Sequence, residues 1–349
     1  MVDVRELLQN AVEKGASDLH ITQDMPPMLR IDGELRPTPY EVLNREQTKK
    51  IVYGLLNDKQ KVTFEEQLEL DFSIFLAGLC RFRVNVHMQK GSVEAAFRVI
   101  PNVIKSVEDL GLPPILNELA RRPNGLVLVT GPTGVGKTTT LAAMVDLINN
   151  ERRCLIVSIE DPIEYVHKHK KSIVKQREVG IDTRSFANAL RHALRQDPNV
   201  ILVGEMRDLE TISTAITAAE TGHLVLSTLH TPDAPQTVDR LIDIFPPHQQ
   251  EQIKVQLAGC LQGVVCQQLL PRKDKKGRIP VCEVMIATSA VRSLIREHKT
   301  EQLLTVIQTG GQYGMTTMDK SIKRLFLDGA IDIETAHLRV KDKAEFEKL

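Results

Sequence analysis

The sequence contains no tryptophan, and aromatic residues make up only 4% of its 349 positions. Proteins that bind single-stranded nucleic acid stack the bases on aromatic side chains, so this scarcity argues against such a role. An excess of charge is also missing, because 45 lysines and arginines balance 45 aspartates and glutamates. A dedicated nucleic-acid-binding protein usually carries a basic excess, so no nucleic-acid partner is expected.

Cysteines are few and long apolar runs are absent. No C-x-x-C pair occurs among the five cysteines: Cys80, Cys154, Cys260, Cys266 and Cys282. This spacing predicts neither a zinc site nor a disulfide framework, and it is typical of a reducing compartment. No segment approaches the roughly 18 apolar residues of a membrane span, and no signal-peptide pattern is found. We therefore expect a soluble, cytoplasmic protein.

A glycine-rich loop is the most informative feature that the chain does contain. It fits the phosphate-loop pattern G-x-x-x-x-G-K-[ST] at every fixed position: Gly131-Pro132-Thr133-Gly134-Val135-Gly136-Lys137-Thr138. The apolar run 126–129 before it predicts a buried strand, and 139–148 predicts a helix that begins at Thr139. The loop N–H groups bind phosphate, Lys137 bridges the β- and γ-phosphates, and the Thr138 hydroxyl ligates Mg²⁺. The sequence therefore predicts a site for ATP and Mg²⁺, and we include Thr139 in it.

Helix and strand patterns predict two domains. Short helices and alternating strands over residues 1–101 predict a small α+β domain. Residues 102–114, which follow Pro101 and end in two prolines, are predicted to be a linker. From 115 to 349 strands alternate with helices, which predicts a parallel α/β domain whose last part, from about residue 285, is helical.

One polar strand face in the N-terminal domain has two interpretations. Arg81, Arg83, Asn85 and His87 alternate with apolar residues on one predicted strand, and Arg98 lies on the next. Alternating polar residues commonly face solvent. Guanidinium groups also suit phosphate oxygens, so these arginines are candidates for contacting a phosphate bound elsewhere. The pattern alone does not choose between the two.

Acidic residues follow two predicted strands of the C-terminal domain. Four apolar runs predict its strands: 126–130, 154–159, 200–204 and 223–228. Ligands of open α/β sheets bind beyond the carboxyl ends of the strands. Glu160, Asp161 and Glu164 follow the second strand, where they either cap a turn or orient Mg²⁺ and activate the attacking water. Glu205 follows the third strand, where a Walker B acid lies beside the metal.

Two histidines flank the fourth predicted strand. His223 opens this strand and His230 ends it. A single histidine is more often structural, but the end of this strand shares the edge of the sheet at which the phosphate loop lies. His230 is therefore a candidate for contacting the γ-phosphate.

Taken in order, these motifs resemble the secretion-ATPase superfamily. The resemblance covers essentially the whole chain and rests on four segments: the phosphate loop, 160–164, 204–208 and 222–230. Residues 290–297 are also similar to a C-terminal motif of the type IV pilus retraction ATPases, although Val291 and Ser293 replace its isoleucine and asparagine. The four-cysteine zinc insertion of pilus-assembly and type II secretion ATPases is missing.

The resemblance implies a PAS-like N-terminal domain before a RecA-like ATPase domain, assembled as a homohexamer. It implies that Glu164 is the general base and that Glu205 is the Walker B acid, with Glu160 and Glu205 toward Mg²⁺. It implies that His230 contacts the γ-phosphate. It further implies that three arginines of the N-terminal domain reach the nucleotide: Arg83, Arg98 and, less securely matched, Arg81.

The implied function is Mg²⁺-dependent ATP hydrolysis that powers pilus retraction and twitching motility. The implied partner is a pilus platform protein at the inner face of the cytoplasmic membrane, and membrane association is expected only through that partner. Three alternatives stay open: an accessory retraction ATPase, a DNA-translocating ATPase on the same core, and a scaffold that binds ATP without hydrolysing it.

Overall fold

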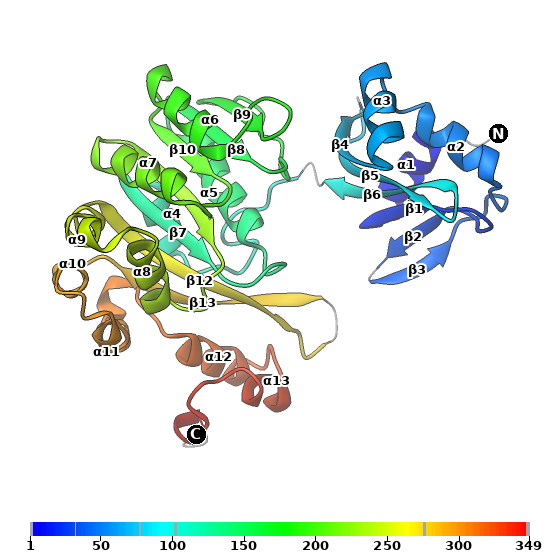
Figure 1. Ribbon diagram of the computed structural model, residues 1–349. Helices are drawn as coiled ribbons and strands as arrows, with labels where there is room; N and C mark the ends of the chain where they lie inside the picture. Colours follow the sequence, from blue (N-terminus) through cyan, green and yellow to red (C-terminus); the bar gives the residue numbers. More distant parts are fainter. Residues whose placement is uncertain (1–2, 32, 77, 101–102, 275–276, 347–349) are drawn as a thin grey trace. The chain divides into compact units, whose positions relative to one another are not determined.

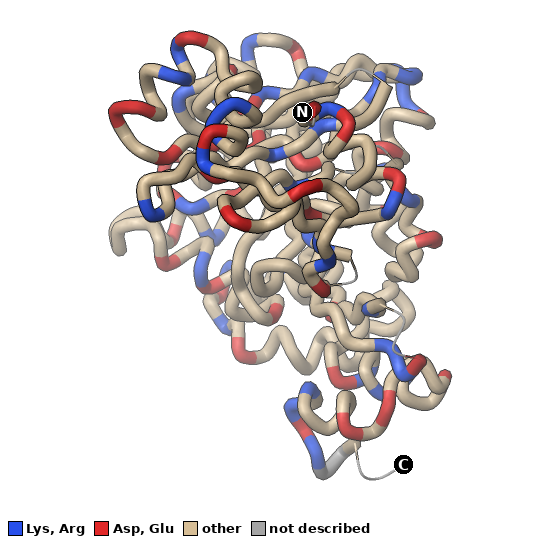
Figure 2. The backbone as a smooth tube through the Cα atoms, turned by 90° about the vertical axis from the view of Figure 1, so that its right-hand side faces the viewer, with Lys and Arg blue, Asp and Glu red and all other residues tan. Residues whose placement is uncertain are grey.

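The computed structural model describes residues 3–346 apart from 32, 77, 101–102 and 275–276. It divides into two compact units, unit 1 up to Val103 and unit 2 from Ile104 onward. Across the described residues, no helix combines the length and the apolar character needed to cross a membrane. Basic and acidic residues are interleaved along the chain (Figure 2), and their numbers are equal.

Unit 1 packs three helices on an antiparallel sheet (Figure 1). Its described residues form six strands in the spatial order β3-β2-β1-β6-β5-β4: β1 (Asp18–Ile21), β2 (Met28–Ile31), β3 (Glu34–Pro37), β4 (Glu69–Phe75), β5 (Arg81–Gln89) and β6 (Ser92–Ile100). The helices are α1 (Val4–Glu13), α2 (Arg45–Tyr53) and α3 (Asp58–Gln67). Phe82, Val84 and Val86 of β5 are buried in the core, so the alternating arginines lie on the opposite face.

Unit 2 is built on a mostly parallel sheet. Its described residues form seven strands in the order β13-β12-β7-β11-β10-β8-β9: β7 (Gly125–Thr130), β8 (Leu155–Glu160), β9 (Ile173–Glu178), β10 (Val200–Val203), β11 (Leu224–Leu229), β12 (Leu261–Pro271) and β13 (Arg278–Ile286). Only β13 is antiparallel to its neighbour among these strands. The carboxyl ends of the other six therefore lie at one edge.

Helices connect and cover these strands (Figure 1). Six precede or follow strands of the sheet: α4 (Ile115–Ala120), α5 (Lys137–Glu151), α6 (Phe186–Ala193), α7 (Leu209–Glu220), α8 (Ala234–Asp243) and α9 (Pro247–Cys260). The C-terminal part is helical, as predicted: α10 (Ser289–Arg296), α11 (Leu303–Thr309), α12 (Met318–Leu327), α13 (Ile333–His337) and α14 (Lys343–Phe346).

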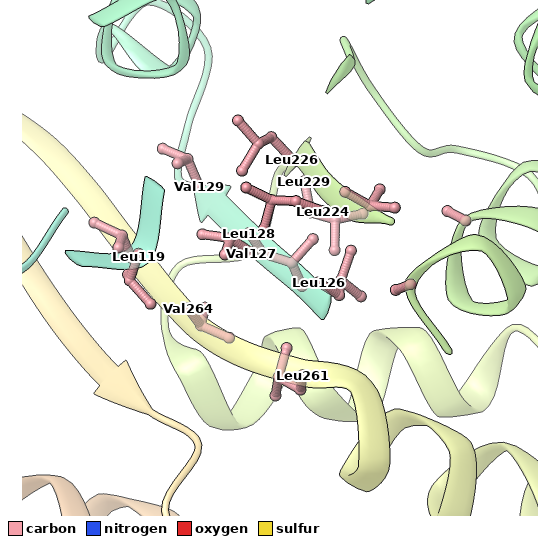
Figure 3. Packing of buried hydrophobic residues seen from close by; sticks show 14 of the residues in the cluster. Leu119, Leu126, Val127, Leu128, Val129, Leu224, Leu226, Leu229, Leu261 and Val264 are labelled. Atoms are coloured by element: carbon pink, nitrogen blue, oxygen red, sulfur yellow. The ribbon is translucent and has the colours of Figure 1, made fainter. Parts of the chain in front are cut away.

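The core of unit 2 centres on β7, the strand that leads into the phosphate loop. Figure 3 shows Leu126 to Val129 of β7 between Leu224 and Leu226 of β11 and Val264 of β12. All six residues of β7 are buried, which holds the start of the loop in a fixed position.

The segment that the sequence assigns to a linker belongs largely to unit 2. Val107 and Leu112 are buried in the core of this unit, although they lie within 102–114. The prolines that suggest a linker come just before α4, and Pro114 is its N-cap residue. Residues 101–102 lie outside the described part of the chain.

Candidate active site

Glycines shape the phosphate loop between β7 and α5. Gly131, Gly134 and Gly136 have φ values of 134°, 80° and 88°, a region that other residues rarely adopt. Gly136 is the N-cap residue of α5, and no side chain caps this helix. The first N–H groups of α5 therefore have no side-chain acceptor, and they point toward the loop with the positive end of the helix dipole. This geometry suits an anion.

The lysine of the loop is folded onto the loop itself. Lys137 is buried, and its Nζ donates to the carbonyl oxygens of Gly131 at 2.7 Å and Pro132 at 2.9 Å. Burial lowers the pKa of Lys137, and the negative charges of Glu205 and Glu164 act in the opposite direction. Both carboxylates thus lie close enough to the ammonium group to affect its charge.

His230 connects the lysine to an acid on another strand. Its Nδ1 lies 3.5 Å from Lys137 Nζ, and its Nε2 lies 3.1 Å from Glu205 Oε1. The ammonium group can only donate and an ionised carboxylate can only accept, so the neutral imidazole with its proton on Nε2 satisfies both partners. His230 directly follows β11, and Glu205 comes two residues after β10. The parallel register of these two strands brings the two residues together.

Arg207 completes this row of charged groups. Its Nε donates to the same Glu205 Oε1 at 2.6 Å. Asp208 is the N-cap residue of α7, because its Oδ1 accepts from the Thr211 N–H at 2.8 Å. The short turn after β10 therefore ends at a capped helix start, and Arg207 in this turn holds the carboxylate of Glu205.

The two acids after β8 differ in their surroundings. Glu160 is the last residue of β8 and is buried, and its Oε1 accepts from Ser158 Oγ at 2.7 Å and from Gln176 Nε2 at 3.1 Å. Burial raises the pKa of Glu160 to about 7. Glu164 is exposed. A solvent-accessible carboxylate near Lys137 is suited to accept a proton from water, whereas Glu160 has its hydrogen-bond partners inside the sheet.

The oxygen ligands here suit Mg²⁺ that arrives with a nucleotide. Within the described residues, no three His, Cys, Asp or Glu side chains gather into a group that could hold a metal ion. Mg²⁺ bound to ATP takes most of its ligands from phosphate and water, so one or two protein oxygens are sufficient. Thr138, in the first turn of α5, and Glu205 fit that requirement better than the buried Glu160.

Thr139 is held by a residue that the sequence motifs do not include. Its Oγ1 lies 2.9 Å from the hydroxyl oxygen of Tyr165, directly after the acidic segment 160–164. This hydrogen bond connects the start of α5 to the loop that carries Glu164. The signal for Tyr165 in the sequence was only its position next to Glu164.

The three candidate arginines of unit 1, Arg81, Arg83 and Arg98, lie on one face of its sheet. Arg83 is exposed and lies directly opposite Arg98 in the β5–β6 register. Arg98 Nε donates to Asp18 Oδ1 at 2.9 Å, and Arg81 Nη2 donates to Ser73 Oγ at 2.5 Å. Two like charges directly opposite each other disfavour the sheet, so Asp18 partly offsets the Arg83–Arg98 repulsion.

The family follows from a match over nearly the whole chain. A sequence model of the type II/IV secretion system protein family matches residues 1–337. The chain belongs to this family. The matched residues include the phosphate loop, the acidic segment 160–164 and His230.

Two pilus ATPases and a solved structure are similar to this chain over most or all of their length. The type IV pilus retraction ATPase PilT of Pseudomonas aeruginosa is 48% identical over 345 residues, which cover 99% of this chain and 100% of PilT. The type IV pilus ATPase PilU of the same organism is 42% identical over 335 residues, covering 96% of this chain and 88% of PilU. A crystal structure of the pilus retraction motor PilT with bound ADP covers 100% of both chains, with a TM-score of 0.94 and 48% identity.

Proposed function

We propose that this protein is an ATPase motor that powers retraction of type IV pili, with MgATP as its substrate. The observation that best supports ATPase activity is the pair of contacts that connects Lys137, at the end of the phosphate loop, through His230 to Glu205. The full-length similarity to PilT supports pilus retraction as the process. PilU is also similar, at lower identity, which favours the primary over the accessory motor.

Each residue has a role that follows from its chemistry. Lys137 exchanges acceptors that it has within the site for β- and γ-phosphate oxygens, and the N–H groups of the loop and of the first turn of α5 surround the phosphates. Thr138 and Glu205 hold Mg²⁺, which neutralises the charge that develops on the phosphates. Glu164 orients and deprotonates the attacking water, and His230 contacts the γ-phosphate while it holds Glu205.

The larger assembly is part of the same proposal. Unit 2 serves as a RecA-like ATPase domain, and unit 1 serves as a PAS-like domain. Six copies form a ring that works on a pilus platform protein at the inner face of the cytoplasmic membrane. Arg83 and Arg98, with Arg81 beside them, remain predicted to contact the nucleotide.

A deletion strain and a purified variant test the two parts of the proposal separately. Loss of the gene should increase the number of surface pili and abolish twitching, whereas loss of pili would indicate an assembly motor. Lys137→Ala should fail to restore twitching and should not release phosphate from ATP. Lys254→Ala is the matched control, because Lys254 is also a buried lysine but lies on α9. Hydrolysis that requires added DNA would instead favour a DNA translocase.

A further inference from the structure

Gln267, on β12 beside the phosphate loop, makes two hydrogen bonds to it. This side chain is only 3% exposed. Its Oε1 accepts from Thr140 Oγ1 at 2.7 Å, and its Nε2 donates to the carbonyl oxygen of Val135 at 2.7 Å. One amide thus connects the last part of the loop to the first turn of α5, across more than 120 residues of sequence.

The backbone at Gln267 also limits which residues the loop can contain. A Cβ atom at Gly131 would lie 2.3 Å from the carbonyl oxygen of Gln267, closer than any real contact. A Cβ at Gly136 would lie 3.2 Å from Gln267 Nε2. The loop therefore lies directly on this residue of β12, and Gly131 is required by that contact as well as by its φ value, whereas the contact at Gly136 is only tight.

We infer that Gln267 is a positioning residue of the phosphate loop, which orients a loop peptide for phosphate binding. The inference rests on the proposed nucleotide site. The C=O and N–H of one peptide group point in opposite directions, because the group is planar and trans. When Gln267 holds the Val135 carbonyl against β12, the N–H of Gly136 must point away from β12. This arrangement also directs the Val135 carbonyl dipole away from an anion that would repel it.

Only an amide meets both demands of this position. Glutamine donates to Val135 and accepts from Thr140 at the same time. An ionised glutamate of the same shape still accepts from Thr140 but cannot donate to a carbonyl. Leucine removes the hydrogen-bond partner of the buried Val135 carbonyl and of the buried Thr140 hydroxyl. Each loss destabilises the loop conformation that the hydrogen bond holds in place. We expect nucleotide affinity to fall about tenfold to a hundredfold in either variant.

Binding of a fluorescent methylanthraniloyl-ADP by the full chain tests this inference. The variants are Gln267→Glu and Gln267→Leu, each compared with wild type at pH 8 and pH 6. We expect both to bind about tenfold to a hundredfold more weakly at pH 8. At pH 6 Gln267→Glu should regain affinity relative to wild type, because a buried carboxyl is readily protonated and can then donate. Gln267→Leu should show no such recovery. A purely structural defect would not predict that Gln267→Glu regains affinity at pH 6.

Gln268→Glu is the matched control, since neighbouring residues of a strand point to opposite faces and Gln268 is only half-buried. It should bind like wild type at both pH values. Unchanged affinity in both Gln267 variants, while Lys137→Ala no longer binds, would overturn the role of Gln267 and leave the nucleotide site in place. Full binding by Lys137→Ala would instead refute the site itself. If Gln267→Leu does not fold, the pH response of Gln267→Glu alone decides, and a weak affinity that does not respond to pH contradicts the inference.

Discussion

Replacing Glu160 with glutamine tests how much a buried carboxylate destabilises the sheet of unit 2. Glu160 ends β8 and has little contact with solvent. Its Oε1 accepts hydrogen bonds from Ser158 and Gln176, and a glutamine oxygen can accept the same two bonds. The substitution therefore removes the charge and keeps the shape.

The magnitude follows from the pKa of the group. Burial raises the pKa of Glu160 from 4.5 to about 7. One pKa unit corresponds to about 1.4 kcal/mol, so this rise corresponds to about 3 kcal/mol of folding free energy. Because the folded state binds the proton more tightly, the contribution is complete below pH 4.5 and is lost as the pH rises through 7. Glutamine does not titrate. The difference in unfolding free energy between the variant and wild type should therefore be about 3 kcal/mol more favourable to the variant at pH 8 than at acidic pH.

Urea unfolding followed by circular dichroism measures this difference. The urea concentration at the unfolding midpoint of Glu160→Gln, minus that of wild type, should be larger at pH 8 than at pH 5. Ser227→Ala is the control, because Ser227 is a buried, uncharged residue of β11 whose Oγ donates to the Val203 carbonyl. Its difference from wild type should be the same at each pH. A Glu160→Gln difference that does not change with pH would refute the reasoning.

Three further predictions concern turnover. Glu164→Gln should retain nucleotide binding but hydrolyse ATP about 10²- to 10⁴-fold more slowly in a single-turnover assay, and a near-normal rate would make Glu205 the better candidate for the base. His230→Ala should lower turnover about tenfold to a hundredfold without changing the circular dichroism spectrum, because it removes the side chain that connects Lys137 to Glu205. An unaltered rate would leave His230 with a structural role only. Arg98→Ala should lower turnover and Arg98→Lys should restore only part of it, because lysine lacks the guanidinium fork; wild-type turnover in both would limit Arg98 to its ion pair with Asp18.

Local motifs explain why much of unit 2 is predictable. The phosphate loop, the acids and His230 each follow a short apolar run, and parallel strands place the ends of such runs at one edge. The predicted runs agree with β7, β8, β10 and β11 to within one residue at either end. The distances between Lys137, His230 and Glu205 were not predictable, because they depend on strand order and on the rotamers of long side chains.

Gln267 shows where sequence patterns stop being informative. It lies in a mostly apolar strand without a motif, and its partners Val135 and Thr140 are more than 120 residues away. Only the pairing of Cys266 with Thr130 between β12 and β7 brings it beside the loop. The segment 102–114 failed as a linker for a related reason, since the burial of Val107 and Leu112 depends on contacts with distant residues.

The contacts of Lys137 indicate how a change at the phosphates would reach the rest of the site. An ammonium group has three hydrogens, and here its three neighbours are the Gly131 and Pro132 carbonyls and His230 Nδ1. A phosphate oxygen can be bound only if one of these partners is released. The contact to His230 is the longest, at 3.5 Å, and is therefore the weakest. His230 also holds Glu205, so the partner that Lys137 loses most easily is the one that carries the change from the phosphate loop to the acid beyond β10.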